Sequence, residues 1–163
     1  MLEGCIDWPE DFIRRYQQRG YWQGLSLGQL LHQQAQLNPT REALVDGQRR
    51  WTYAELDQRA DQLAAGLADQ GIRAGQRVLV QLPNIAEFFS LTFALLRLGA
   101  IPVFALPAHR EHELLHLAQL SQAVAYVTVD QHLGFDYRPL ARALLQQASS
   151  LQQTAASMEQ LST

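Results

Sequence analysis

The pattern with the clearest chemical meaning in this sequence is His112-Glu113-Leu114-Leu115-His116. On a helix, the H-E-x-x-H spacing places two imidazoles on one face, where they can bind zinc while the glutamate acts as a general base. A metzincin extension requires Gly at 119 and His at 122, and both positions are glutamine. The first downstream glutamate is Glu159, far along the chain. A zinc hydrolase that uses His112 and His116 is therefore one hypothesis, and the alternative that we favour is a solvated helix face.

Nucleophiles and phosphate-binding loops are the next chemistry to consider. Cys5 is the only cysteine and has no basic neighbour in sequence, so we expect a free thiol rather than a nucleophile. The glycines of the body occur singly at helix ends and in turns, which C-capping explains, and they form no phosphate loop. His109-Arg110 follows an apolar strand and could line a cleft at its carboxyl end, although a polar loop is the interpretation that we favour. These patterns assign no catalytic, cofactor-binding or metal-binding residue.

Composition narrows the class of protein further. The 163 residues are 47% hydrophobic and 18% charged, which is typical of a single globular domain. All 13 basic residues are arginines spread along a chain of net charge −3, which argues against a nucleic-acid surface. The chain has neither a run of 18 apolar residues nor the pattern of a signal peptide, so we expect no membrane span and a cytoplasmic location. The lack of lysine removes the ammonium group that nucleotide-binding enzymes often place on a phosphate.

The elements that must position these residues alternate in type along the chain. A capping box at Thr52 and Glu55 predicts a helix that Gly71 ends, and Asp46-Gly47 predicts a hairpin turn. Further helices are expected over residues 10–18, 27–37, 85–98 and 111–120, and strands over 43–45, 49–51, 77–82, 101–106 and 123–129. Strands that alternate with helices through short connections indicate a parallel sheet, so the predicted fold class is α/β.

The tail from Gln146 to Thr163 differs in kind from the body. Its only charged residue is Glu159. Apolar residues follow heptad spacing at Leu144, Ala148, Leu151, Ala155 and Met158. A short piece of coiled coil and a polar C-terminal helix both fit this pattern. We therefore place a boundary near Gln146, with a body of residues 1–145 and a helical tail of residues 146–163.

Several segments of the body resemble the adenylate-forming enzymes. The segment Trp51-Thr52-Tyr53-Ala54-Glu55-Leu56 is similar to their first core motif, and Leu95–Val103 is similar to their second. Within that superfamily the chain resembles the aryl-acid branch, the 2,3-dihydroxybenzoate–AMP or salicylate–AMP ligases of siderophore biosynthesis. This likeness covers residues 1 to about 145 and is carried by the segments 8–9, 80–84, 87–89, 102–107, 109–110 and 134–138.

The resemblance implies an enzyme that activates an aryl acid with ATP and Mg²⁺ and passes the acyl group to the thiol of an aryl carrier protein. In that family the phosphate loop, the acid pocket and the adenylation lysine come later in the chain. We therefore expect residues 1–145 to be an incomplete N-terminal part of the large domain, without a catalytic residue, a bound cofactor or activity. The partial sheet is expected to keep an unpaired edge and an uncovered apolar surface, through which the chain could self-associate.

The tail resembles the methylation helix of methyl-accepting chemotaxis receptors instead. In that family the modified residue is the second of a Glu/Gln pair, and Gln153 and Gln160 match this position. The resemblance implies that these two glutamines are candidate modification sites and that the chain is a fusion of two unrelated segments. The alternative to a truncated aryl-acid ligase is a non-catalytic binding or scaffold module that associates through a coiled-coil tail.

Overall fold

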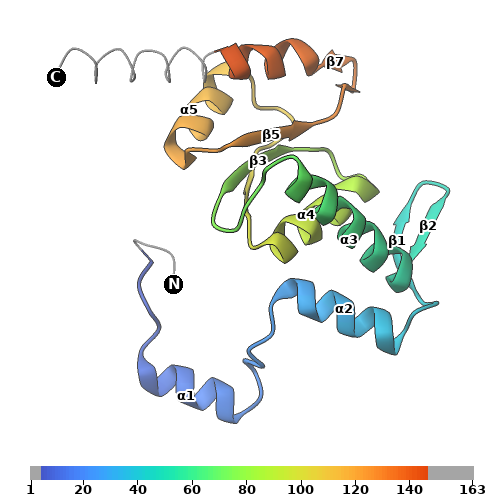
Figure 1. Cartoon of the computed structure of the whole chain (residues 1–163), viewed down its shortest axis with the longest axis vertical. Coiled ribbons are helices and arrows are strands. Elements are labelled where there is room, and N and C mark those ends of the chain that lie inside the picture. Colours follow the sequence, from blue (N-terminus) through green and yellow to red (C-terminus); the bar gives the residue numbers. More distant parts are fainter. Residues whose placement is uncertain (1–4, 147–163) are drawn as a thin grey trace.

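The computed structural model describes residues 5–146, so the tail predictions, including Gln153 and Gln160, lie outside the described residues. The described helices are α1 (Glu10–Gln18), α2 (Leu27–Leu37), α3 (Tyr53–Asp69), α4 (Ala86–Leu98) and α5 (Glu111–Ser121) (Figure 1). The strands are β1 (Glu42–Asp46), β2 (Arg49–Thr52), β3 (Arg77–Gln81), β4 (Ile101–Phe104), β5 (Ala125–Thr128), β6 (Gln131–His132) and β7 (Phe135–Asp136). Residues 138–146 are also helical.

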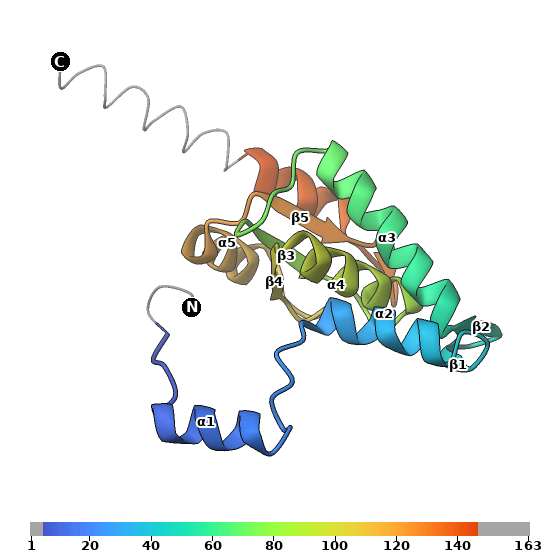
Figure 2. The same ribbon diagram turned by 60° about the horizontal axis from the view of Figure 1, so that its bottom comes forward.

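The body is built on a parallel sheet of three strands in the order β4-β3-β5. Side chains alternate between the two faces of a strand, so Val78 and Val80 pack under α3 and α4 while Leu79 packs on the opposite face. Figures 1 and 2 show α5 and the 138–146 helix covering that second face. The α/β fold class and the parallel sheet predicted from the sequence are therefore confirmed.

Both outer strands of this sheet have one unpaired side within the described part of the chain. In β4, the amides of Ile101 and Ala105 donate to the carbonyls of Gln76 and Val80, so the intervening Pro102 turns its backbone outward. Because proline has no N–H, this edge offers few donors to another strand. The edge of β5 contains no proline and presents the backbone of Val127 outward.

Local sequence signals account for the helix boundaries. The Thr52 hydroxyl accepts the Glu55 N–H at 3.2 Å and the Glu55 carboxylate accepts the Thr52 N–H at 2.8 Å, which is the predicted capping box of α3. Gly99 ends α4 with a positive φ of 70°, a conformation that glycine adopts without steric cost. The predicted elements agree with the structure to within two residues at most boundaries, and β4 ends at Phe104, two residues earlier than predicted.

The chain after β5 contains two elements that the sequence patterns did not predict. The small β6–β7 hairpin has only two residues in each strand, too few for an alternating pattern, and turns through Leu133 and Gly134 at positive φ. The 138–146 helix buries Leu140 and Leu144 against β3 and α5. Leu144, the first residue of the heptad series, therefore packs into the body. No helix among residues 5–146 is long and apolar enough to cross a membrane.

Candidate functional site

The carboxyl ends of β3, β4 and β5 meet at one edge of the sheet, and this edge is the candidate functional site. After β3 the chain continues into α4, which covers one face of the sheet. After the neighbouring β4 it continues into α5, which covers the opposite face. In open α/β sheets, ligands bind in the crevice where neighbouring strands diverge in this way. The loop that follows β4 contains His109 and Arg110, so the structure places both residues at the edge where the sequence predicted them.

Gln81, the last residue of β3, organises this edge from within the protein. Its side chain is only 1% exposed, and a buried amide requires hydrogen-bond partners. The Gln81 Nε2 donates to the carbonyl oxygens of Leu106 at 2.8 Å and His109 at 3.0 Å. Its Oε1 accepts a hydrogen bond from the Tyr126 hydroxyl. Gln81 therefore fixes the loop after β4 against both neighbouring strands.

The loop after β4 is also held from its outer side. The Pro107 carbonyl accepts hydrogen bonds from the Tyr137 hydroxyl at 2.8 Å and from the Arg110 guanidinium at 2.9 Å. The Arg110 guanidinium also stacks 3.9 Å from the centroid of the Phe135 ring. Arg110 thus lines a cleft of about 500 Å³ beside the β6–β7 hairpin, while the His109 Nδ1 accepts the Leu106 N–H within the loop. Both residues serve the conformation of the loop, as the polar-loop alternative predicts.

The H-E-x-x-H residues lie on α5 and are not joined by a further metal-ligating side chain within residues 5–146. His112 and His116 are exposed, and the Glu113 carboxylate accepts the Arg110 N–H at 3.0 Å at the start of the helix. That hydrogen bond lowers the pKa of Glu113, which suits a helix cap rather than a general base. Within residues 5–146, no three or more His, Cys, Asp or Glu side chains are grouped as metal ligands, and Cys5 is exposed. The geometry is that of a solvated helix face.

A larger cleft of about 690 Å³ opens beside the carboxyl ends of β3 and β5. Trp51 on β2 forms one wall, with the Arg59 guanidinium 4.3 Å from its ring centroid. The other residues that line the cleft include Leu82, Glu87, Ser90, Val127 and Thr128. The cleft therefore runs along the part of β5 whose outer side is unpaired, and its walls are mainly apolar.

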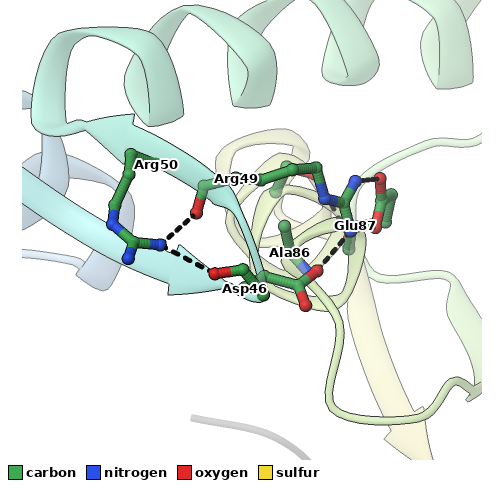
Figure 3. Close-up of polar contacts among 7 residues, drawn as sticks. Asp46, Arg49, Arg50, Ala86 and Glu87 are labelled. Atoms are coloured by element: carbon green, nitrogen blue, oxygen red, sulfur yellow. Dashed lines mark hydrogen bonds and ion pairs between the residues drawn. The ribbon is translucent and has the colours of Figure 1, made fainter.

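A polar cluster of Asp46, Arg49 and Glu87 fixes the β1–β2 hairpin to the start of α4 at one side of this cleft (Figure 3). The Asp46 carboxylate accepts the Ala86 N–H at 3.0 Å, and Arg49 pairs with both Asp46 and Glu87. The Ala86 N–H, followed by Arg49, lowers the pKa of Asp46. Arg49 also lowers the pKa of Glu87. The two carboxylates are thus engaged in holding the hairpin.

This cluster predicts a loss of stability in acid. Because the folded-state pKa values of Asp46 and Glu87 are depressed, their contribution is present above the ordinary carboxyl pKa and disappears as pH falls through the lowered values. We expect Asp46→Asn to lower the melting temperature at pH 7 and to reduce its further fall toward pH 3. Thermal melts across this range test the prediction, with Asp7→Asn at an exposed position as the control. Parallel curves for Asp46→Asn and the unaltered chain would contradict it.

Comparison with known proteins places this fold in a family. Residues 31–162 match the AMP-binding enzyme family. The matched range contains the capping box of α3, the parallel sheet and the loop after β4. The chain belongs to the AMP-binding enzyme family. The match extends past Gln146. The boundary near Gln146 and the resemblance of the tail to a chemoreceptor helix stay predictions.

Individual members of the AMP-binding family show which branch the chain resembles. It is 53% identical over 144 residues to Triostin synthetase I of Streptomyces triostinicus, covering 88% of this chain and 27% of that protein. It is 49% identical over 142 residues to the 2,3-dihydroxybenzoate-AMP ligase of Bacillus subtilis, covering 87% of this chain and 26% of that ligase. The apo structure of MbtA from Mycobacterium smegmatis superposes with a TM-score of 0.79 at 48% identity, covering 88% of this chain and 26% of MbtA. The resemblance to aryl-acid–AMP ligases is confirmed, and the chain spans about a quarter of the length of these relatives.

Proposed function

We propose that residues 1–145 are the N-terminal part of the large domain of an aryl-acid–AMP ligase. The full-length enzyme adenylates 2,3-dihydroxybenzoate or a related aryl acid with ATP and transfers it to an aryl carrier protein in siderophore biosynthesis in the cytoplasm. The observation that carries the proposal is the 49% identity to a 2,3-dihydroxybenzoate-AMP ligase over 87% of this chain. A likeness spread over nearly the whole chain is more specific than one confined to short motifs.

The residues of this chain do not make up a complete binding site for ATP and Mg²⁺. The sequence contains no lysine, and the candidate carboxylates Asp46 and Glu87 are already paired with Arg49. Developing charge on the adenylyl group that is transferred requires preorganised donors. At the carboxyl edge, the Arg110 guanidinium donates to the Pro107 carbonyl and stacks on Phe135, and the Arg59 guanidinium lies over the Trp51 ring. We therefore assign ATP, Mg²⁺ and the aryl acid to later parts of the ligase and no catalytic residue to this chain.

The contribution of this chain is a structural platform. The Gln81 hydrogen bonds and the cluster of Asp46, Arg49 and Glu87 hold the loops at the carboxyl edge in fixed positions. The adjacent cleft and the unpaired side of β5 offer an apolar surface and backbone groups to the segment that continues the sheet. Without that segment the same edge is available for self-association of the chain.

A chimera tests the proposed function directly. The matched N-terminal part of the Bacillus subtilis ligase is replaced by residues 1–145, and ATP–pyrophosphate exchange is measured with 2,3-dihydroxybenzoate and with salicylate. We expect the chimera to catalyse exchange with one of these acids, because the platform supplies the same fold at 49% identity. The purified 163-residue chain is expected to give no exchange above a blank without enzyme. A folded, inactive chimera, or activity of the chain alone, would overturn the proposal.

A further inference from the structure

Five aromatic side chains gather in the N-terminal segment, outside the core clusters of the described residues. We call this set the aromatic arm, and its members are Trp8, Phe12, Tyr16, Tyr21 and Trp22. Ring centroids lie 5.4 Å apart for Tyr16 and Trp22, 5.9 Å for Trp8 and Trp22, and 6.1 Å for Phe12 and Tyr16. These are the separations at which edge-to-face pairs are favourable, so the rings form one contiguous cluster.

Backbone contacts give the arm a defined local structure. Gly20 adopts a φ of 71°, which turns the chain back after α1. The amides of Tyr21 and Trp22 then both donate to the Tyr16 carbonyl, at 2.9 and 3.2 Å. The Arg15 guanidinium lies 4.5 Å from the centroid of the Phe12 ring. The cluster is therefore preorganised, and preorganisation lowers the entropic cost of binding a partner.

The arm is almost uncovered within the described part of the chain. No residue of α1 is buried, and Trp8 and Tyr21 are 55% and 66% exposed. Figures 1 and 2 both show α1 standing away from the sheet and its helices, joined to α2 by an irregular stretch. A contiguous exposed aromatic patch of this kind marks an interaction surface, because Trp and Tyr dominate the energetics of protein interfaces.

The comparisons indicate which proteins share the segment that holds the arm. The general match to AMP-binding enzymes begins at residue 31, after this segment. The match to the vibriobactin-specific 2,3-dihydroxybenzoate-AMP ligase of Vibrio cholerae spans 152 of the 163 residues and therefore includes most of it. The segment thus aligns with part of an aryl-acid ligase that is about four times as long as the match.

We propose that the aromatic arm docks on an apolar surface of the ligase in the part of the large domain that follows this chain. The proposal rests on the proposed function, since it requires that the chain is one part of a larger ligase. The charges of α1 argue against a strongly charged partner, because Glu10 and Asp11 balance Arg14 and Arg15 and leave the helix with no net charge. The exposed rings of Trp8 and Tyr21 favour an apolar partner. A helix that binds anionic lipid is rich in basic residues instead.

The test compares the chimera described above with the 163-residue chain, each with and without the double substitution Phe12→Ala/Tyr16→Ala. Alanine preserves helix propensity, so α1 is retained while two rings of the cluster are removed, among them Tyr16, which contacts three of the other four. We expect the substitutions to lower the melting temperature of the chimera by several degrees and to leave that of the 163-residue chain unchanged. Leu37→Ala, at a 74% exposed position of α2, is the control and is expected to change neither protein.

The outcomes separate this inference from the proposed function. An unsubstituted chimera without exchange activity counts against the proposed function, whereas the arm is judged by the melting temperature alone. Equal melting temperatures of the chimera with and without Phe12→Ala/Tyr16→Ala would overturn the inference. An equal fall in the melting temperatures of the chimera and the 163-residue chain would also overturn it, because the aromatic arm would then pack on the body described here. Loss of a dimer of the 163-residue chain on substitution would identify a second copy as the partner, and binding of the chain to anionic vesicles would identify a membrane.

Discussion

Replacing Leu79 by alanine is expected to lower the free energy of unfolding by about 3–5 kcal/mol, the upper part of the range for buried leucines. Leu79 is 0% exposed and lies in the central strand, where it packs against Leu114, Leu140 and Leu144. Strands on both sides fix the backbone of β3, so the site cannot collapse around the missing atoms. A loss of this size is a large fraction of the stability of a domain, which is about 5–15 kcal/mol.

The space around Leu79 already contains a partly open pocket. It has a volume of about 130 Å³, is lined mainly by apolar side chains that include Leu79, Ala118 and Leu144, and lies between β5, α5 and the 138–146 helix. Removing the Leu79 side chain adds its volume to this space, and the cost of a cavity grows with the volume that is added. Urea unfolding followed by circular dichroism measures the change. Leu120→Ala, at an exposed position of α5, is the control, with an expected change of less than about 0.5 kcal/mol.

Two results would contradict the argument for Leu79. A loss below about 1 kcal/mol would mean that neighbouring side chains refill the space, as they do at sites that can relax. An equal loss for Leu120→Ala would mean that the surface of α5 is less exposed than the structure shows.

The sequence predicted most of the body because the relevant signals are local. The capping box at Thr52 and Glu55 and Gly99 at the end of α4 each act within a few residues. The predicted β1–β2 hairpin is present, but its turn is Gly47-Gln48 rather than Asp46-Gly47, because Asp46 pairs with Arg49 as the last residue of β1. The apolar runs of β3 and β4 are typical of strands that are covered on both faces. The β6–β7 hairpin escaped prediction because its two-residue strands are too short to carry a periodic pattern.

The candidate site was predictable only in its location. The position of His109-Arg110 after an apolar strand placed both residues at the carboxyl edge of the sheet. Their partners are distant in sequence, because Arg110 stacks on Phe135 and the loop is held by Gln81 and Tyr137. Likewise, Arg49 meets Glu87 only through the packing of the hairpin on α4. One available signal was missed: Gln81 is a polar residue at the end of an otherwise apolar strand, and a buried amide needs partners.

Replacing Gln81 by leucine is expected to cost about 2–4 kcal/mol, because it removes three hydrogen bonds while leaving their partners in place. Leucine is close to glutamine in size, so the change tests hydrogen bonding more than volume. The His109 carbonyl and the Tyr126 hydroxyl each lose the hydrogen bond to a side chain that is only 1% exposed, and the Leu106 carbonyl keeps only the His109 N–H. We expect a lower urea midpoint and faster amide exchange at the start of α5, which follows the loop. Gln119→Leu, on the exposed face of α5, is the matched control.

A double-mutant cycle with Tyr126→Phe separates the hydrogen bonds from any change in packing. Burial raises the pKa of Tyr126, so its hydroxyl is neutral at pH 7 and donates to the Gln81 Oε1. In the unaltered chain, Tyr126→Phe removes that hydrogen bond and is expected to cost about 1 kcal/mol. In the Gln81→Leu background the hydroxyl has already lost this acceptor, so its removal should be neutral or should restore part of the lost stability. Additive losses in the double variant would show that Gln81 and Tyr126 act independently, and the cost of Gln81→Leu would then come from its hydrogen bonds to the Leu106 and His109 carbonyls.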